Sequence, residues 1–171
     1  MKLIVGLGNP ESRYDNTRHN VGFAMLDQYI AAQKITWREQ VKFHAITAHT
    51  IIGNETIILA KPTTYYNDCG IAARALIDFY KLSHDDLLVI HDDIVLDFGK
   101  VRIRRGGQDA GNNGLKSLHR YIGQAFWHIR IGADNPRRRQ IGDIDFVLSE
   151  FNLNEAQILA EWTAPTVARI I

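Results

Sequence analysis

The chain has 171 residues, 46% hydrophobic and 23% charged, with a net charge of +1, and this balance excludes a disordered protein. No apolar run reaches the roughly 18 residues of a membrane-spanning helix, and residues 1–6 are too few for a secretion signal, so we expect a cytoplasmic protein with no membrane partner. The single cysteine excludes an internal disulfide framework, and the length fits one domain over residues 1–171.

The N-terminal part of the sequence predicts a strand followed by a helix. Residues 3–6 form a short apolar run that a Gly-Asn-Pro turn ends, which is typical of a buried strand. Asn16 or Thr17 can cap a helix that extends to about Gln33, because apolar residues recur there at helical spacing.

The next part predicts two strands and a second helix. The strands are expected at 43–50 and 55–61, joined by a Gly-Asn turn. Asn67 or Asp68 is expected to cap the helix, whose apolar stripe runs as far as Phe79.

The remaining elements continue the alternation of strands and helices. Residues 87–90 are uniformly apolar, as in a strand buried on both faces, and a polar loop is expected at 91–97. Further elements are expected as strands at 101–104 and 127–131, a helix at 113–122, and a final helix at 153–170 that Pro165 kinks or interrupts.

This order of elements predicts an α/β fold with a twisted, mixed and largely parallel β-sheet flanked by helices. In such folds, functional residues gather where strands end and loops begin. We therefore expect the site where the polar loops 8–19, 62–70 and 91–97 meet the Gly-rich segment 106–114.

Basic residues are concentrated between Phe98 and Gln140. This segment contains only two acids, Asp109 and Asp134, against ten basic residues: Lys100, Arg102, Arg104, Arg105, Lys116, Arg120, Arg130, Arg137, Arg138 and Arg139. Such asymmetry is typical of a surface that faces a polyanion, although an ordinary solvated face gives the same pattern.

Several common kinds of site are not supported by the sequence. Gly6-Leu7-Gly8 lacks the third glycine of a dinucleotide fingerprint, since Glu11 stands there. No pair of histidines has the spacing of a zinc protease site, and no GxSxG elbow is present. We therefore expect no cofactor and no metal. Cys69 could be an activated nucleophile, but a buried inert thiol is the commoner case.

Two places in the sequence suit acid–base chemistry, and each also has a purely structural interpretation. His19 lies near a loop-to-helix junction between two polar residues, where a histidine without a catalytic role is also common. Asp92 and Asp93 follow an apolar strand, so their carboxylates could hold a neighbouring imidazole or could simply begin a solvated loop.

Amide and aromatic side chains in two turns are open to the same two interpretations. Asn67 and Asn113 could donate to an ester carbonyl, or could serve as ordinary turn and cap residues. Tyr65 and Tyr66 could stack on an adenine or ribose, or could divide between surface and core.

Four motifs occur in order along the chain. They are Gly6-Leu7-Gly8-Asn9-Pro10 with Tyr14 and Thr17-Arg18-His19-Asn20-x-Gly22, then Pro62-Thr63-Thr64-Tyr65-x-Asn67-x-x-Gly70, then His91-Asp92-Asp93, and then Gly111-x-Asn113-Gly114-Leu115-Lys116 with Arg130-Ile131-Gly132. Their order and spacing resemble the bacterial-type peptidyl-tRNA hydrolase family across most of the chain.

The resemblance implies a role for each matching residue. His19 falls on the catalytic histidine, a general base, and Asp92 falls on the aspartate that keeps it basic. Asn9 falls on the position that distinguishes a blocked peptidyl amide from a free aminoacyl group. The other matches are substrate contacts at Tyr14, Tyr65, Asn67 and Asn113, and contacts to a terminal phosphate of the tRNA acceptor stem at Arg104 and Arg130.

The resemblance also implies an activity. The expected enzyme hydrolyses the ester between a peptide and the 3′-terminal adenosine of tRNA, and so recycles tRNA from stalled translation. It is expected to act as a monomer on peptidyl-tRNA without a metal. The alternatives are a catalytically idle RNA-binding relative on the same scaffold, similar to a splicing factor, and an unrelated small-molecule esterase. The basic segment disfavours the esterase.

The sequence departs from the family pattern at several positions around these motifs. Glu11 stands where the family usually has glycine, Tyr66 where it has methionine, and Asn112 where it has histidine. Residues 94–97 differ from the usual Leu-Asp-Leu-Pro, and residues 109–110 disturb the glycines of the fourth motif. None of these departures removes an expected catalytic group. The C-terminal helical tail of the family is expected to be missing or reduced.

Overall fold

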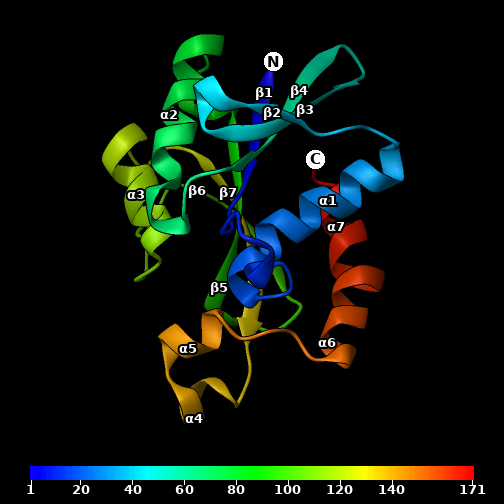
Figure 1. Cartoon of the computed structure of the whole chain (residues 1–171), viewed down its shortest axis with the longest axis vertical. Coiled ribbons are helices and arrows are strands. Elements are labelled where there is room, and N and C mark those ends of the chain that lie inside the picture. The colour runs from blue at the N-terminus through cyan, green and yellow to red at the C-terminus, as the bar shows by residue number, and fades with distance from the viewer.

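The computed structural model describes residues 1–171 as an α/β fold around one seven-stranded sheet (Figure 1). The strand order is β2-β3-β4-β1-β5-β7-β6, parallel at the centre and antiparallel toward both edges. The strands are β1 (Lys2–Gly6), β2 (Arg38–Gln40), β3 (Ala45–Ile52), β4 (Glu55–Pro62), β5 (Leu87–Asp97), β6 (Val101–Arg105) and β7 (Trp127–Asp134). The predicted mixed sheet is confirmed.

Helices cover both faces of this sheet. Figure 1 shows α2 and α3 on one side, and α1, α6 and α7 on the other. The helices are α1 (Val21–Gln33), α2 (Cys69–Tyr80), α3 (Asn113–Ile122), α4 (Arg138–Ile141), α5 (Asp143–Val147), α6 (Leu153–Ile158) and α7 (Ala164–Ala168). None of them combines the length and apolar character needed to cross a lipid bilayer.

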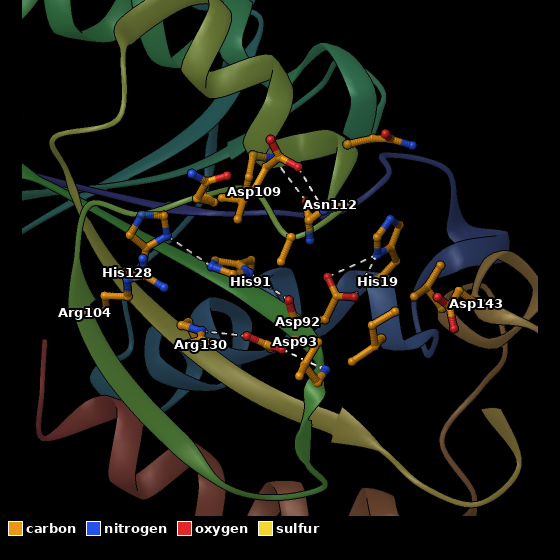
Figure 2. A pocket seen from close by; sticks show the side chains of 18 of the residues that line it. His19, His91, Asp92, Asp93, Arg104, Asp109, Asn112, His128, Arg130 and Asp143 are labelled. Carbon is orange, nitrogen blue, oxygen red and sulfur yellow. Dashed lines mark hydrogen bonds and ion pairs between the residues drawn. The ribbon is translucent and has the colours of Figure 1, made fainter. Parts of the chain in front are cut away.

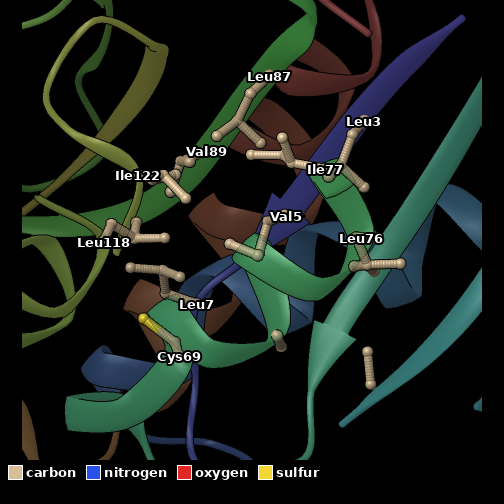
Figure 3. Close-up of a cluster of buried hydrophobic side chains, with 14 of the residues drawn as sticks. Leu3, Val5, Leu7, Cys69, Leu76, Ile77, Leu87, Val89, Leu118 and Ile122 are labelled. Atoms are coloured by element: carbon tan, nitrogen blue, oxygen red, sulfur yellow. The ribbon is translucent and has the colours of Figure 1, made fainter. Parts of the chain in front are cut away.

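The covered sheet has a hydrophobic core on each face. Leu3 and Val5 of β1 belong to the core under α2 and α3, part of which Figure 3 shows, whereas Ile4 between them belongs to the core under α1 and α7. Because both faces are covered, neighbouring residues of a central strand are all apolar rather than alternating. Each such side chain contributes about 1.5–3 kcal/mol when fully buried.

The prediction that β5 ends at residue 90 is wrong. β5 continues to Asp97, pairing with β7 through Asp93 and again at Asp97 after an irregularity, whereas β1 pairs with β5 only as far as Ile90. The strand therefore continues through polar residues, because β7 still supplies backbone hydrogen bonds after the apolar run has ended. Beyond Ile90, β5 extends past the end of β1 and is paired only with β7. We call this offset between the two strand ends the step in the sheet.

Other boundaries also differ from the sequence-based expectation. α1 begins at Val21, after a 3₁₀ turn at Arg18–Asn20, rather than directly after Thr17. The expected helix over 153–170 is divided into α6, a π-helical turn and α7, with Pro165 at the start of α7. Proline has no N–H to complete an α-helical turn, which explains the interruption. The short elements β2, α4 and α5 were not predicted.

Candidate active site

His19 and Asp92 meet at the step in the sheet, although 73 residues separate them in the sequence. His19 Nδ1 lies 3.0 Å from Oδ2 and 3.1 Å from Oδ1 of Asp92, as Figure 2 shows. The Asp92 side chain is 2% exposed and that of His19 is 13% exposed. The buried carboxylate therefore occupies Nδ1, and Nε2 of His19 makes no hydrogen bond within the protein.

The backbone around His19 is held close to the sheet. A Cβ on Gly22, at the start of α1, would lie 2.4 Å from the carbonyl oxygen of Ile90 and 2.5 Å from the amide nitrogen of Leu7. Only glycine fits at this contact, so the helix can approach the ends of β1 and β5. The 3₁₀ turn before it then brings His19 within reach of Asp92.

The electrostatic surroundings keep Asp92 ionised. Burial alone would raise the pKa of this carboxyl, but attraction to His19 and hydrogen bonds from His19 and Tyr66 outweigh it and lower the pKa. A buried carboxylate that remains charged can accept the Nδ1 proton of the imidazole and stabilise the imidazolium once it forms.

Tyr66 completes this arrangement, and the sequence did not identify its role. Its ring stacks on the His19 ring, with centroids 3.6 Å apart and planes 9° apart. Its hydroxyl donates to Asp92 Oδ1 at 2.7 Å. The neighbouring Tyr65 is 51% exposed whereas Tyr66 is 2% exposed, so the pair divides between surface and core.

A cavity of about 180 Å³ opens beside the pair. Five of the predicted site residues line it: His19, Asp92, Asn113, Arg104 and Arg130. The structure thus brings together residues from the 3₁₀ turn, three strands and the start of α3. The cavity wall also includes residues that the sequence analysis did not select, among them Asn112, His128, Asp143 and Ile144.

The other four predicted site residues do not line this cavity. Asn9 is buried, exchanges two hydrogen bonds with Asn20, and accepts a hydrogen bond from the Tyr66 backbone N–H at 2.9 Å. Its Oδ1 is therefore occupied by the Tyr66 backbone, and Asn9 is not among the residues that line the cavity. Tyr14 is half-buried under the Arg13 guanidinium, and Asn67 is exposed beside Tyr66.

Tyr65 is exposed outside the cavity lining, and its hydroxyl donates to Glu11. Glu11 also pairs with Arg13 at 2.9 Å, so this residue joins the loop after β1 to the loop after β4. Glu11 is one of the departures from the family pattern, and it has a structural role here.

The far end of the cavity is basic. Arg130 donates to Asp93 at 2.6 Å, so its charge is partly neutralised. Arg104 is exposed and forms no ion pair, and its guanidinium packs against Gly107, where a Cβ would lie 1.9 Å from Nη2. Gly107 has φ +121, so glycine suits this position both in its backbone and in the space it leaves for the arginine.

Two buried histidines line the cavity beside this basic end. His91 Nδ1 donates to the backbone carbonyl of Asp92 at 2.7 Å, so its Nε2 is the acceptor for His128 Nδ1 at 3.2 Å. Burial lowers the pKa of both groups, that of His128 to about 3, so the pair stays neutral. The two histidines are hydrogen-bonded to each other and to the backbone that carries Asp92, whereas His128 Nε2 has no partner.

The basic segment is partly neutralised by acids within it and elsewhere in the chain. Ion pairs join Lys100 to Asp97, Arg105 to Asp85, Arg130 to Asp93, and Arg138 to Asp134 and Asp143. The other basic residues of the segment form none. A positive surface therefore remains around β6, next to the cavity.

Neither a thiol nor a metal cluster contributes to this site. Cys69 is buried, its thiol donates to the carbonyl of Gly114, and burial raises its pKa to about 12. It is therefore inert as a nucleophile. No three histidine, cysteine, aspartate or glutamate side chains are grouped so that they could hold a metal ion.

Comparison with known proteins gives one consistent family. A family model described as peptidyl-tRNA hydrolase matches residues 3–170. The chain is 40% identical over 184 residues to the peptidyl-tRNA hydrolase of Leuconostoc mesenteroides, with 98% of this chain and 97% of that protein covered. It is 42% identical over 162 residues to that of Clostridium botulinum, covering 94% and 83%.

The fold agrees with a solved structure that carries the same description. The peptidyl-tRNA hydrolase from Acinetobacter baumannii superposes with a TM-score of 0.84 at 31% sequence identity. The superposition covers 99% of this chain and 83% of that chain.

Proposed function

The chain belongs to the peptidyl-tRNA hydrolase family, and on this premise we propose that His19 and Asp92 carry out its hydrolytic step. The protein is a peptidyl-tRNA hydrolase, a carboxylic ester hydrolase that acts in translation. We also propose that residues 1–171 form a single domain, and the family match over residues 3–170 supports this.

The bond cleaved is the ester between the peptide carboxyl and a ribose hydroxyl of the terminal adenosine. His19 acts as the general base: Asp92 occupies Nδ1, so the lone pair on Nε2 takes a proton from the attacking water. A positioned base of this kind contributes about 10²–10⁴ to the rate. The water oxygen bonds to the carbonyl carbon, and the tRNA ribose oxygen then leaves with a proton.

Asp92 fixes the tautomer of His19 and stabilises the imidazolium formed during the reaction. Its lowered pKa supports this role, because the carboxyl is charged at neutral pH and can only accept from Nδ1. The stacked Tyr66 ring leaves the imidazole little freedom to rotate out of this arrangement.

Asn113 is proposed to stabilise the oxyanion of the tetrahedral intermediate. It is the first residue of α3 and lines the cavity, and its Oδ1 faces Lys116 Nζ at 3.4 Å, which leaves the amide N–H groups to donate. One such donor is worth about 3 kcal/mol of transition-state stabilisation. Asn67, on the exposed turn, is instead proposed to bind a more distant part of the substrate.

Three predicted site residues outside the cavity lining are proposed to hold the parts of the substrate next to the ester. Tyr65 and Tyr14 offer aromatic faces for the terminal adenosine or the peptide. Asn9 makes no hydrogen bond through Nδ2, so this amide can test for the carbonyl of a blocked peptide.

Arg104 and Arg130 are proposed to hold a phosphate of the acceptor stem. Contacts of this kind give an affinity that falls as salt rises and carry little sequence information. They suit an enzyme that accepts many different tRNAs. Arg104 is the stronger candidate, because Arg130 already shares its charge with Asp93.

The observation that carries this mechanism is the His19–Asp92 pair at the cavity wall. The decisive assay compares release of an N-acetyl-aminoacyl group from tRNA with release of an unblocked aminoacyl group. We expect rapid hydrolysis of the blocked substrate and slow hydrolysis of the unblocked one. Binding of tRNA without release would identify an idle RNA-binding relative. Equal cleavage of a nitrophenyl ester would identify a general esterase.

Three properties complete the proposal. Activity is expected to survive dialysis against a chelator, which tests independence from metal. A single monomer peak is expected in light-scattering chromatography. A cytoplasmic location follows from the substrate, which translation produces there, and fractionation of the source cells would test it.

A further inference from the structure

We propose that Tyr66 is a positioning residue of the hydrolytic site, which holds the His19 ring by stacking and directs its hydroxyl proton onto Asp92 in an orientation set by Asn112. This inference rests on the proposed function of His19 and Asp92. It adds a chain of hydrogen bonds that begins at the N-terminus of α3 and ends at the general base.

The direction of each hydrogen bond follows from the one before it. Asn112 is the N-cap of α3, and its Oδ1 accepts the N–H of Leu115 at 3.0 Å. Its Nδ2 therefore points the other way and donates to the Tyr66 hydroxyl oxygen at 3.0 Å. Because that oxygen accepts from Asn112, the hydroxyl proton is directed to Asp92 Oδ1, 2.7 Å away.

Asp92 is consequently shared between two donors. Its Oδ1 accepts from both Tyr66 and His19, whereas Oδ2 accepts from His19 alone. A donor on a carboxylate disperses its charge and weakens its pull on a second proton. The Tyr66 hydroxyl therefore limits how strongly Asp92 favours the imidazolium form of His19.

The hydroxyl keeps its proton over the working range of the enzyme. Burial and the neighbouring Asp92 charge raise the pKa of Tyr66 well above its ordinary value. Its position is also fixed from behind, since its backbone N–H donates to Asn9 and its ring packs against Gly114, where a Cβ would lie 2.4 Å from Cε1. The ring can therefore serve as a rigid support for the imidazole.

Other ionisable groups around the cavity do not account for the effect of the Tyr66 hydroxyl on the His19–Asp92 pair. They are Asp93 on β5, Arg104 on β6, His91 on β5, His128 and Arg130 on β7, Asp109 in the Gly-rich segment and Asp143 on α5. Asp93 is paired with Arg130, and the two histidines stay neutral. The charges of Asp109, Asp143 and Arg104 are the same in every variant below, so differences between variants report on Tyr66 and Asn112.

The first test is Tyr66→Phe, which keeps the stacked ring and removes the hydroxyl. Asp92 then attracts the imidazole proton more strongly, so a larger fraction of His19 is protonated at a given pH. We expect the acid limb of the kcat/KM profile to move up by roughly one pH unit, while the plateau at higher pH changes by less than about fivefold. Tyr29→Phe is the matched control, because Tyr29 is a buried tyrosine on α1 whose hydroxyl makes no hydrogen bond.

The second test separates stacking from hydrogen bonding. Tyr66→Leu removes both, and we expect the same shift of the acid limb together with a plateau that is lower by about a further tenfold, because the imidazole is less well oriented. The ring protons of His19 should also lose the upfield NMR shift that the Tyr66 ring current causes. Tyr66→Phe should retain it.

The third test examines the orientation that Asn112 sets. Asn112→Ser keeps a good N-cap but removes the Nδ2 donor, so the Tyr66 hydroxyl is less firmly directed to Asp92. We expect a smaller upward shift of the acid limb than in Tyr66→Phe. The double variant should shift no further than Tyr66→Phe alone, because both changes act through the same hydroxyl.

NMR titration of His19 in the free protein keeps this inference distinct from the proposed function. The midpoint of its titration should rise in Tyr66→Phe without any substrate present, whether or not peptidyl-tRNA is cleaved. An unchanged midpoint in a folded Tyr66→Phe protein would overturn the proposal. So would a fall in activity that is equal at every pH, since that outcome indicates only a packing role.

Discussion

Arg18 and His19 are neighbours in one 3₁₀ turn, yet they take part in two different buried pairs. Arg18 is 1% exposed and donates through Nη2 to both carboxylate oxygens of Glu155, at 2.8 and 2.7 Å. Its Nη1 donates to the carbonyl of Glu150 at 2.6 Å. His19 pairs with Asp92 but keeps its second ring nitrogen free at a cavity.

The two pairs differ in whether a nitrogen of the basic side chain remains available to a substrate. Both terminal nitrogens of Arg18 are hydrogen-bonded, and the guanidinium lies over the rings of Phe146 and Phe151. Arginine also does not release its proton near neutral pH. This pair therefore fastens the chain around α6 to the turn that carries His19. The His19 pair has an open position and a proton that can move, so it can perform chemistry.

The largest effect on activity is expected from removing the His19 imidazole. His19→Ala should lower kcat by about 10³-fold, because base catalysis contributes on the order of 10²–10⁴. The free energy of unfolding should change by less than about 1 kcal/mol and tRNA binding should persist, since the phosphate contacts are elsewhere. Single-turnover hydrolysis, urea unfolding and a filter-binding assay measure the three quantities.

His84→Ala is the matched control, because His84 is exposed and makes no side-chain hydrogen bond. Turnover by His19→Ala close to that of this control would contradict the role of His19 as the base.

Breaking the Arg18–Glu155 pair should lower stability and leave activity largely unchanged. Glu155→Gln leaves the buried Arg18 charge uncompensated, which should cost about 3–5 kcal/mol of stability. Activity per folded molecule should stay within a few fold at low temperature. Urea unfolding measures the loss, with the exposed Glu150→Gln as control. A decrease of less than about 1 kcal/mol in the free energy of unfolding would contradict the stabilising role inferred for the Arg18–Glu155 pair.

Phosphate binding can be tested at the basic end of the cavity. Arg104→Glu should raise KM by about tenfold and reduce the slope of log KM against log salt by about one, as expected for one lost phosphate contact. The control is Arg38→Glu on β2, the strand at the opposite edge of the sheet. If both variants have the same salt slope as the parent, Arg104 does not contact a phosphate.

The smallest effect is expected from moving Arg104 without removing it. Gly107→Ala places a Cβ 1.9 Å from Nη2 of Arg104, so the flexible guanidinium must shift, and KM should rise about threefold with kcat unchanged. Gly111→Ala is the matched control, because Gly111 also has a positive φ, of +87, but a Cβ there meets nothing within 4 Å. Equal effects in the two variants would assign the change to backbone strain alone.

The sequence predicted most of the fold because the main elements bury apolar residues that recur at strand or helix spacing. The strands β3 and β4 and the helices α2 and α3 lie within a few residues of the expected positions. The prediction failed where backbone pairing rather than side-chain burial defines the element. The polar half of β5 is a strand only because β7 lies beside it. The short α4 and α5 bury too few apolar residues to give a periodic pattern.

The candidate site was predicted in part, and the residues that the sequence did not identify were missed for the same reason. The family resemblance selected His19, Asp92, Asn113, Arg104 and Arg130, and the structure brings them to one cavity. Tyr66 could not be told from Tyr65 by sequence, because its partners, Asp92 and Asn112, are 26 and 46 residues away. The Arg18–Glu155 pair spans 137 residues and has no local signal.

The paired strands β5, β7 and β6 also set a fixed length between the two ends of the cavity. Asp92 is opposite Ile131 on β7, whereas Arg104 on β6 is opposite His128, three residues away along β7. Two strand spacings and this offset together separate the two backbone positions by about 14 Å. Backbone hydrogen bonds hold this spacing, and no loop can adjust it. With the roles proposed for Asp92 and Arg104, the sheet would select substrates by the distance between the ester and a phosphate rather than by the identity of the peptide or base.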